Sequence, residues 1–527
     1  MVAASELNID TGASAIDMAE EIFGDGVQVV NATYTGDNRS SGIFSDGDTT
    51  SPGVTPSDTG VMFSTGRLSG FTNGSGDANQ DSNQSTGSRG ENGNDDFDDL
   101  AGTRTYDASY IDVDVIPDGE YITLQFTFSS EEYPEYAGSI YNDIVGVWVN
   151  GEPVELPIGG TTSVGSVHSG SNENLYLSNT NSEFNTEMDG LTVTMTVKIK
   201  VNPDEVNSLR IGIADVADSN YDSTLIIAGN SGQTKLIAND DVATIYPNGS
   251  TTIDVTANDI GPGNSSVTVT HISGVAVTSG DSVTLTTGQV VTLNGDGTLT
   301  VDGDGDIEDV NFTYSVATGG GSSNITDTGY VTVNSIPCFV AGTMISTPDG
   351  DKRVEDLVPD DLVLTHDNGA QPLRWIGRRV VPAEDNFAPI RIAAGTFGDH
   401  AELLLSPQHR ILIRDALAEL LFGDTEVLVS AKDLVNDQSV RRMEGGEVEY
   451  VHLLFDRHEV IYSEGLATES FLPGPQTTQS FEREIVEEIC TLFPEIDPDT
   501  GEGYSPAARR TLRGYEAKVL MSQGLAA

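Results

Sequence analysis

Short runs in which apolar and polar side chains alternate recur along the first part of this 527-residue chain. Two clear examples are Tyr121–Phe128 (YITLQFTF) and Leu191–Ile199 (LTVTMTVKI). A period of two places one face of a strand in a core and the other face in solvent. Turns rich in Gly, Asn, Asp and Ser separate such runs. The pattern predicts a mainly β protein in which the strands form antiparallel sandwiches.

The chain is strongly acidic, with 82 Asp and Glu against 25 Lys and Arg and a formal net charge of −57. Proteins that bind nucleic acids neutralise phosphates with clustered Lys and Arg, so we expect no nucleic-acid partner. Two interpretations of the acids remain. They are oxygen ligands for hard cations such as Ca²⁺, or they keep the surface soluble through mutual repulsion. The second interpretation accounts for most of them.

Cysteine content and hydropathy limit the possible settings of the protein. The two cysteines, Cys338 and Cys490, are too few for a disulfide framework and lie in segments of different character. No apolar run approaches the length of a transmembrane segment. Residues 1–7 lack the basic and apolar regions of a cleavable signal peptide. If the protein is secreted or reaches the cell surface, we expect another export route.

Length and changes in composition predict three domains and a tail. Residues 1–236 form an N-terminal β-sandwich-like domain that begins with a short helix capped by Ser14. Residues 237–335 alternate short strands with tight turns, as in an immunoglobulin-like sandwich, and resemble the cadherin-like repeats of bacterial surface proteins. Residues 336–475 are richer in Arg and again mostly strand, and residues 476–527 are a helical tail.

Details within these domains follow from local pattern. Residues 72–99 have almost no apolar side chains and are expected to form a long surface loop. In the tail, Ser505-Pro506 has the residue types of a helix N-cap and first turn. Apolar residues at helical spacing around Cys490 predict that this cysteine contributes to packing. We expect the tail to pack on the preceding domain, and the alternative is that it serves as an export signal.

Two acidic segments of the first domain contain candidate cation ligands. SSEEYPEY carries Glu131 and Glu132 and is followed by Asp143, and IADVADSNYDS carries Asp215 and Asp218. If these carboxylates converge, they would bind one Ca²⁺. The alternative is that they are turn and loop residues satisfied by backbone N–H groups and solvent.

The same two segments resemble the choice-of-anchor L family, a bacterial extracellular β-domain found beside varied anchoring devices. The resemblance covers most of residues 1–236. It implies a surface or secreted setting and does not identify a reaction.

Four segments follow one another in residues 336–475. They are IPCFVAGT at 336–343, QPLRWIG at 371–377, LSPQHR at 405–410 and YVHLLFDRHE at 450–459. In this order they resemble the Hint family, the self-processing domain shared by Hedgehog proteins and inteins, and they are most similar to its bacterial branch. The resemblance implies a compact all-β Hint fold.

The Hint resemblance implies a reaction of the chain on itself. Cys338 would attack the carbonyl of Pro337, and an N–S acyl shift would convert the scissile Pro337–Cys338 amide into a thioester. His409 would handle the proton of the leaving nitrogen. Ser406, at a position where the family usually has Thr, would hydrogen-bond the scissile peptide. His458 matches a later family histidine and is expected to assist.

Other residues of this region are less well placed by the resemblance. His452 ranks below His458, and the aspartate that Hedgehog-type domains use cannot be assigned between Asp367 and Asp399. Taken singly, Cys338 could be a small buried hydrophobe, and Ser-Pro-Gln-His could be a turn. The ordered set of Cys, Ser-x-x-His and His favours processing. The reaction would be a single turnover and would need no cofactor.

The final products depend on how the thioester is resolved. Inteins finish splicing by cyclising an asparagine, and no asparagine follows Asn436 in this sequence. We therefore predict no splicing. The thioester would be resolved by water or by transfer of the N-terminal fragment to an acceptor nucleophile. The rival hypothesis is a calcium-stabilised adhesion or anchoring protein that binds a cell-surface ligand and carries an inert Hint scaffold. A carbohydrate-binding first domain has no positive evidence.

Overall fold

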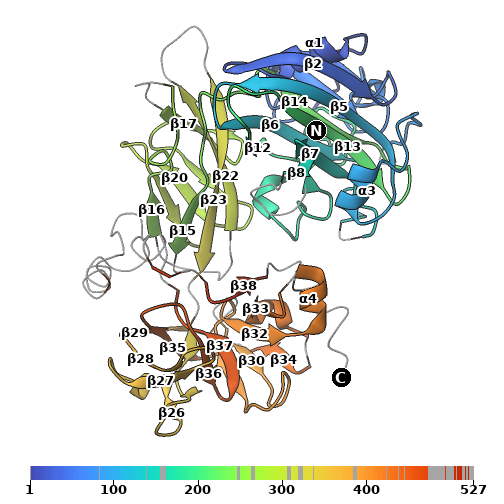
Figure 1. The fold of residues 1–527 in the computed structure, drawn as a ribbon. Coiled ribbons are helices and arrows are strands. Elements are labelled where there is room, and N and C mark those ends of the chain that lie inside the picture. Colours follow the sequence, from blue (N-terminus) through green and yellow to red (C-terminus); the bar gives the residue numbers. More distant parts are fainter. Residues whose placement is uncertain are drawn as a thin grey trace. The chain divides into compact units, whose positions relative to one another are not determined.

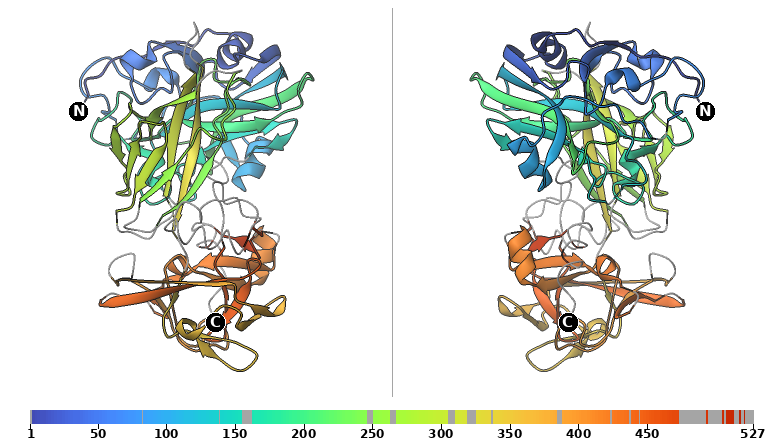
Figure 2. Two further views of the ribbon diagram at one scale, coloured as in Figure 1. Left: turned by 90° about the vertical axis from the view of Figure 1, so that its left-hand side faces the viewer. Right: turned by 90° about the vertical axis from the view of Figure 1, so that its right-hand side faces the viewer.

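The computed structural model describes residues 2–472 except 82, 138, 155–161, 246–249, 263–266, 305–309, 319–324, 336–337, 384–387, 423, 437 and 444, and also residues 493, 504–505, 507–512, 517 and 520. By its contacts the chain divides into two units. The first contains residues 1–241, 254–299 and 310–332, and the second contains residues 242–253, 300–309 and 333–527. Strands dominate both units, which confirms the predicted mainly β fold (Figures 1 and 2).

The N-terminal part of the first unit contains two antiparallel sheets. One sheet has the order β1 (Asn8–Asp10), β3 (Ser41–Ser45), β4 (Gly60–Ser64), β14 (Ser223–Ala228), β6 (Tyr121–Ser130), β11 (Gly190–Thr192) and β10 (Tyr176–Ser178), and β12 (Met195–Lys200) also pairs with β6. The other has the order β2 (Val27–Thr35), β5 (Thr105–Pro117), β13 (Asn207–Val216), β7 (Ile144–Val149) and β8 (Glu152–Pro153), and β9 (Thr162–Ser163) pairs with β7.

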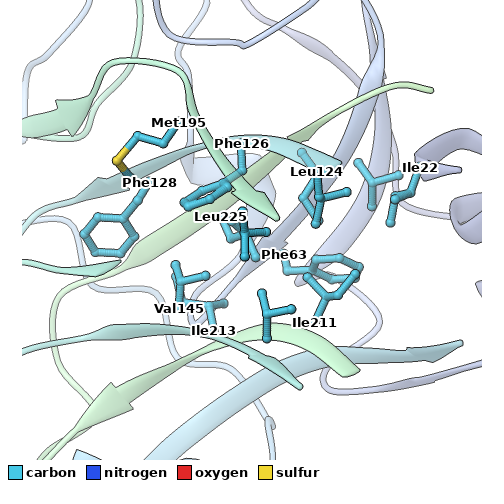
Figure 3. Packing of buried hydrophobic residues seen from close by; sticks show 14 of the residues in the cluster. Ile22, Phe63, Leu124, Phe126, Phe128, Val145, Met195, Ile211, Ile213 and Leu225 are labelled. Carbon is cyan, nitrogen blue, oxygen red and sulfur yellow. The ribbon is translucent and has the colours of Figure 1, made fainter. Parts of the chain in front are cut away.

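The two sheets share a buried apolar core. Phe126 and Leu225 come from one sheet and Ile211 and Ile213 from the other, and Figure 3 shows their side chains pointing toward each other. Full burial of each such side chain contributes about 1.5–3 kcal/mol. This core fixes the positions of β6, β7 and β13, and the predicted acidic cation ligands lie at or next to the ends of these strands.

Local sequence signals of the first domain are mostly confirmed. Helix α1 (Ala15–Ile22) begins after Ser14, and Ser14 and Asp17 form a reciprocal capping box. Strand β6 contains the alternating run Tyr121–Phe128. The predicted strand Leu191–Ile199 is interrupted after Thr192, and its two parts, β11 and β12, pair with different stretches of β6.

The expected surface loop ends earlier than predicted. Helix α3 (Asp95–Ala101) begins after Asn94, whose side chain accepts hydrogen bonds from the N–H groups of Asp96 and Phe97. The Phe97 ring is fully buried, with its centroid 4.8 Å from that of Trp148. A good cap and one buried ring therefore form a short helix in an otherwise polar segment.

Further strands lie between residues 241 and 335. In the first unit, β17 (Val267–Ile272) pairs with β18 (Val275–Ala276) and β22 (Val310–Thr318), and β19 (Ser282–Thr284) pairs with β20 (Val290–Leu293). The remaining strands of this segment are β15 (Asp241–Ile245), β16 (Ser250–Ile253), β21 (Leu299–Asp302) and β23 (Thr326–Ser335).

The larger part of the second unit contains two more sheets. One has the order β29 (Trp375–Pro382), β35 (Glu447–Leu454), β24 (Phe339–Val340), β31 (Leu403–Leu405), β30 (Ile390–Ile392) and β34 (Val440–Arg442). The other has the order β26 (Lys352–Arg353), β25 (Met344–Ile345), β36 (Val460–Ser463), β37 (Leu466–Glu469), β32 (Arg410–Arg414), β33 (Glu426–Ser430) and β38 (Arg510–Thr511), with β27 (Leu362–Thr365) on β36 and β28 (Gly369–Pro372) on β27. Helix α4 (Ala416–Phe422) follows β32.

The described part of the tail differs from the predicted helix after Ser505-Pro506. Residues Arg510–Thr511 form strand β38, which pairs in parallel with β33. The N–H of Leu512 donates to the carbonyl of Leu428, and the Leu512 side chain joins the core. Helical backbone occurs at residues 517 and 520. The free edge of β33 offers backbone partners that outweigh the local N-cap signal.

Among the described residues, none of the helices has the length and apolar character needed to span a membrane.

Candidate active site

Cys338 directly precedes an inner strand of the second unit. Its neighbour Phe339 begins β24, and Phe339 is paired with Leu405 of β31 on one side and Val451 of β35 on the other. The Cys338 side chain is 7% exposed and lies beside Val448 and Tyr450. Pairing on both sides fixes the backbone at this point, so the amide nitrogen and thiol of Cys338 have defined positions.

Both reactive atoms of Cys338 have a polar neighbour. Its N–H donates to the Ser406 hydroxyl oxygen at 2.8 Å, and its carbonyl accepts from the Ser406 N–H at 3.0 Å. Its Sγ lies 3.5 Å from Nε2 of His452, which is 2% exposed. The Ser406 contact is the one expected from the sequence. His452 therefore lies next to the thiol, whereas its place in the sequence ranked it below His458.

His409 is buried near Cys338 and Ser406. It is 1% exposed, and its ring centroid lies 4.2 Å from that of Phe339. Within the described residues neither ring nitrogen has a hydrogen-bond partner. Burial lowers the pKa of His409 to about 4, against the opposing effect of the Glu469 charge, so the ring is neutral near pH 7. Backbone groups of Cys338 and Glu469 near the ring also oppose this lowering, and a neutral imidazole at this position can take up and deliver a proton.

Glu469 is a charged neighbour that the sequence patterns did not reveal. Its side chain is fully buried, Oε1 accepts from the Arg410 N–H at 2.9 Å, and Oε2 lies 3.3 Å from Nη1 of Arg410. Burial alone would raise the pKa of Glu469, but Arg410, together with His458 and His409, holds it at about 2. Glu469 is therefore an ionised carboxylate, and its charge favours a proton on His409.

His458 holds part of the tail. Its Nε2 lies 3.1 Å from the carbonyl of Ser470 and 3.5 Å from Glu469, and its Nδ1 accepts from the N–H of Ala508 at 2.9 Å. The second bond makes Nδ1 an acceptor, so Nε2 carries the proton toward Ser470 and Glu469. Both His458 and His409 therefore lie near the charge of Glu469.

The remaining candidates of this region have other positions. Asp367 forms an ion pair with Arg509 at 2.7 Å, and Asp399 is exposed. Pro337 and Cys490 lie outside the described residues.

The five predicted cation ligands of the first domain do not share one point. Glu132 and Asp143 are neighbours, with Oε2 of Glu132 accepting the Asp143 N–H at 3.3 Å. The charge of Asp143 helps raise the pKa of the buried Asp215, and the charge of Asp218 acts on both Glu132 and Asp143. Glu131, the preceding residue, faces a different set of acids.

The environment of Glu131 is separate. Burial first, then the charges of Asp189, Asp81 and Glu187, raise the pKa of Glu131 to about 10, and neither of its oxygens has a hydrogen-bond partner among the described residues. Glu131 and Glu132 lie in the turn that follows β6, and their side chains have different acidic neighbours. Within the described part of the chain, no three His, Cys, Asp or Glu side chains are grouped closely enough to hold a metal ion between them.

Comparisons with known families identify two regions. Residues 337–475 match the family model of the Hint domain, and residues 8–233 match that of the Choice-of-anchor L domain. Both resemblances drawn from the sequence are therefore confirmed. The Hint match assigns the region that contains Cys338, Ser406, His409 and His452 to a class of self-processing domains. No curated protein matches the chain.

Several solved intein structures are similar to a part of the chain. The gp41-1 intein is 14% identical, covers 25% of this chain and 97% of its own, and has a TM-score of 0.18. The MchDnaB-1 intein is 13% identical, with 25% and 98% coverage and a TM-score of 0.18. A splice-inactive AceL NrdHF class 3 split intein is 15% identical, with 26% and 97% coverage and a TM-score of 0.19.

Proposed function

We propose that the Hint domain cleaves its own chain at the Pro337–Cys338 bond through a thioester, without splicing. One observation carries the proposal. The nitrogen that would leave and the sulfur that would attack belong to the same residue, and each has its own polar neighbour, Ser406 and His452. A cysteine that served only as a small buried hydrophobe would need neither contact.

The first step is activation of the nucleophile. Nε2 of His452 takes the thiol proton of Cys338, and the thiolate attacks the carbonyl carbon of Pro337. The attack forms the S–C bond and a tetrahedral intermediate that still contains the C–N bond. Ser406 holds the N–H of the scissile amide through its hydroxyl oxygen and so fixes the plane of that amide.

The second step is departure of the amine. The C–N bond breaks, and the nitrogen of Cys338 takes up one proton to become a free amine. Neutral His409 is the residue that we assign to this proton transfer. It first takes up the proton that His452 removed from the thiol, which gives an imidazolium stabilised by the ionised Glu469, and it then donates that proton to the departing nitrogen. The product is a thioester that joins the N-terminal fragment to Cys338.

The third step resolves the thioester. Water gives a fragment that ends in the carboxylate of Pro337 and regenerates the thiol of Cys338. An external nucleophile gives instead a conjugate of the N-terminal fragment. No asparagine follows Asn436 in this sequence, so the cyclisation that ends intein splicing has no residue to use. The match to the Choice-of-anchor L domain supports a surface or secreted destination for the released fragment.

Intact mass of the purified chain tests the proposal. We expect wild-type protein to yield fragments of residues 1–337 and 338–527, and hydroxylamine or dithiothreitol to accelerate their appearance. Cys338→Ala should abolish both fragments. Cys490→Ala is the matched control, because it removes the other cysteine, and it should cleave like wild type. A chain that stays whole under all conditions would favour the rival hypothesis of an adhesion protein with an inert Hint scaffold.

A further inference from the structure

The first domain contains a cavity unrelated to the Hint site. It has a volume of about 380 Å³ and is lined by Glu132, Asp218, Asn83, Asn220 and Ser85 together with three tyrosines. Among the described residues, the lining contains two carboxylates and no basic side chain. The residues come from separate loops, because Asn83 belongs to the long polar segment after β4, Glu132 follows β6, and Asp218 and Asn220 lie between β13 and β14. The cavity is therefore an acidic, oxygen-rich hollow formed by separate loops.

Glu132 is the unusual group in this lining. The residue is 1% exposed. One carboxylate oxygen, Oε2, accepts the N–H of Asp143 at 3.3 Å, whereas Oε1 has no partner among the described residues. A buried carboxyl group with an oxygen left free at a cavity points to a missing positive partner.

A second layer of acids lies behind Glu132. Both carboxylate oxygens of Asp143 accept hydrogen bonds. Oδ1 accepts from the Val216 N–H at 3.1 Å, and Oδ2 accepts from the Ser223 hydroxyl at 2.7 Å. Next to it, Oδ1 of Asp215 is buried with no partner among the described residues, and the residue is 3% exposed. These acids cannot all turn toward the cavity, which explains why no three of the described ones surround one point.

We propose that this cavity binds Ca²⁺ through the carboxylates of Glu132 and Asp218, with amide oxygens of Asn83 and Asn220 and bound water completing the coordination. Ca²⁺ accepts six to eight oxygen ligands, carboxylate and amide alike, in flexible geometry. A volume of about 380 Å³ leaves room for water beside the ion. Mg²⁺ fits less well, because it demands a near-octahedral shell at shorter distances.

The tyrosines of the cavity favour a metal ion over an organic ammonium ligand. Tyr136 packs against both other rings, with centroid distances of 5.8 Å to Tyr141 and 5.2 Å to Tyr221. Its hydroxyl lies 3.5 Å from that of Tyr221, which in turn donates to Asn83 at 3.4 Å. The rings thus contact each other and support the loops, rather than presenting open faces as a cage for an ammonium group requires.

Binding would tie together loops that are far apart in the sequence. The proposal replaces the five-carboxylate site expected from the sequence, since Glu131 faces other acids and Asp143 is engaged by backbone and hydroxyl donors. It concerns the first domain only and is independent of the chemistry proposed at Cys338.

Calorimetric titration with Ca²⁺ tests the proposal on the full-length chain, with Cys338→Ala in every sample to keep the chain whole. We expect a binding event that Glu132→Gln weakens at least tenfold, in line with the loss of a carboxylate from an ion site. Glu135→Gln, which changes an exposed acid of the same segment, should bind like the parent.

Two further readouts keep the test independent of folding defects. In chelator, Glu132→Gln should melt like the parent, because glutamine keeps the size of the side chain and an oxygen that accepts the Asp143 N–H, and only the rise in melting temperature caused by Ca²⁺ should disappear. Tb³⁺ placed in the cavity should luminesce on excitation of the three tyrosines, and Ca²⁺ should quench that signal by competition. The proposal is overturned if Ca²⁺ gives neither heat nor stabilisation, if Glu132→Gln retains both, or if tetramethylammonium binds there and Ca²⁺ does not.

Discussion

The two units of this protein bury carboxylates in opposite ways. In the Hint domain, the fully buried Glu469 has Arg410 beside it at 3.3 Å, and its pKa lies near 2. In the first domain, Glu132 has an acid for a neighbour, and its pKa lies near 9. A buried charge is tolerated when its partner is built into the chain. Where the chain supplies no partner, the group stays protonated or obtains its partner from solution, which is the basis of the proposed Ca²⁺ site.

The comparison predicts the largest effect for removal of the built-in partner. Arg410→Met leaves Glu469 without its cation and should destabilise the Hint domain by about 3–5 kcal/mol, the range for breaking a buried ion pair. Urea unfolding followed by fluorescence measures this, with Trp148→Phe so that Trp375 alone reports on the Hint domain. Arg414→Met is the control, because Arg414 is 78% exposed and lies 3.9 Å from Glu426. Equal losses from the two substitutions would contradict the account.

The thiol of Cys338 also has a partner supplied by the chain, His452, and removal of this histidine should lower the rate of cleavage. His452→Ala should slow appearance of the 338–527 fragment about a hundredfold, the lower part of the range for loss of a general base. Raising the pH should recover part of the rate, because hydroxide replaces the base in forming the thiolate. A time course by mass spectrometry at two pH values checks both points. An unchanged rate would show that His452 only fills space.

Glutamine at the two buried acids gives a matched pair of substitutions. Glu469→Gln replaces an ionised group and should cost about 2 kcal/mol through the loss of charge-assisted hydrogen bonds. In chelator, Glu132→Gln replaces a protonated group and should cost less than about 1 kcal/mol. The two tryptophans, Trp148 in the first domain and Trp375 in the Hint domain, allow each cost to be read separately. Equal costs would remove the distinction between the two regions.

The pH dependence of stability should have opposite signs in the two regions. The lowered pKa of Glu469 stabilises the Hint domain above the ordinary value of 4.5, and this contribution is lost as the pH falls toward 2. The raised pKa of Glu132 has its full stabilising effect below 4.5, and this contribution declines as the pH rises toward 9. Added Ca²⁺ should abolish the decline. Melting curves from pH 3 to pH 9, followed at the two tryptophans, would refute the assignment if both regions responded alike.

Local pattern in the sequence predicted much of the fold. The period of two marked β6, and Ser14 with Asp17 marked the start of α1. The order of the segments around Cys338 and Ser406 predicted the Hint domain, because each segment is a short string that can be recognised without knowing its neighbours in space.

Features that depend on strand register escaped prediction. Pairing of β35 with β24 places Val451 opposite Phe339 and brings the next residue, His452, to the thiol. A shift of one residue would turn His452 to the other face, and nothing in the segment YVHLLFDRHE fixes that choice. Nothing in the sequence next to Glu469 indicates that Arg410 will lie beside it. The tail strand Arg510–Thr511 forms because it pairs with the edge of β33, which the local sequence does not reveal.

The most direct test of the central claim is to trap the thioester at Cys338. Wild-type chain incubated with hydroxylamine and analysed by mass spectrometry should give a 1–337 fragment that carries a hydroxamate on the carboxyl carbon of Pro337. The companion fragment should begin with the unmodified amine of Cys338. Ser406→Thr should preserve this product, because it keeps the hydroxyl that holds the Cys338 N–H. Cleavage at another bond, or a 1–337 fragment that never carries the hydroxamate, would contradict the thioester mechanism.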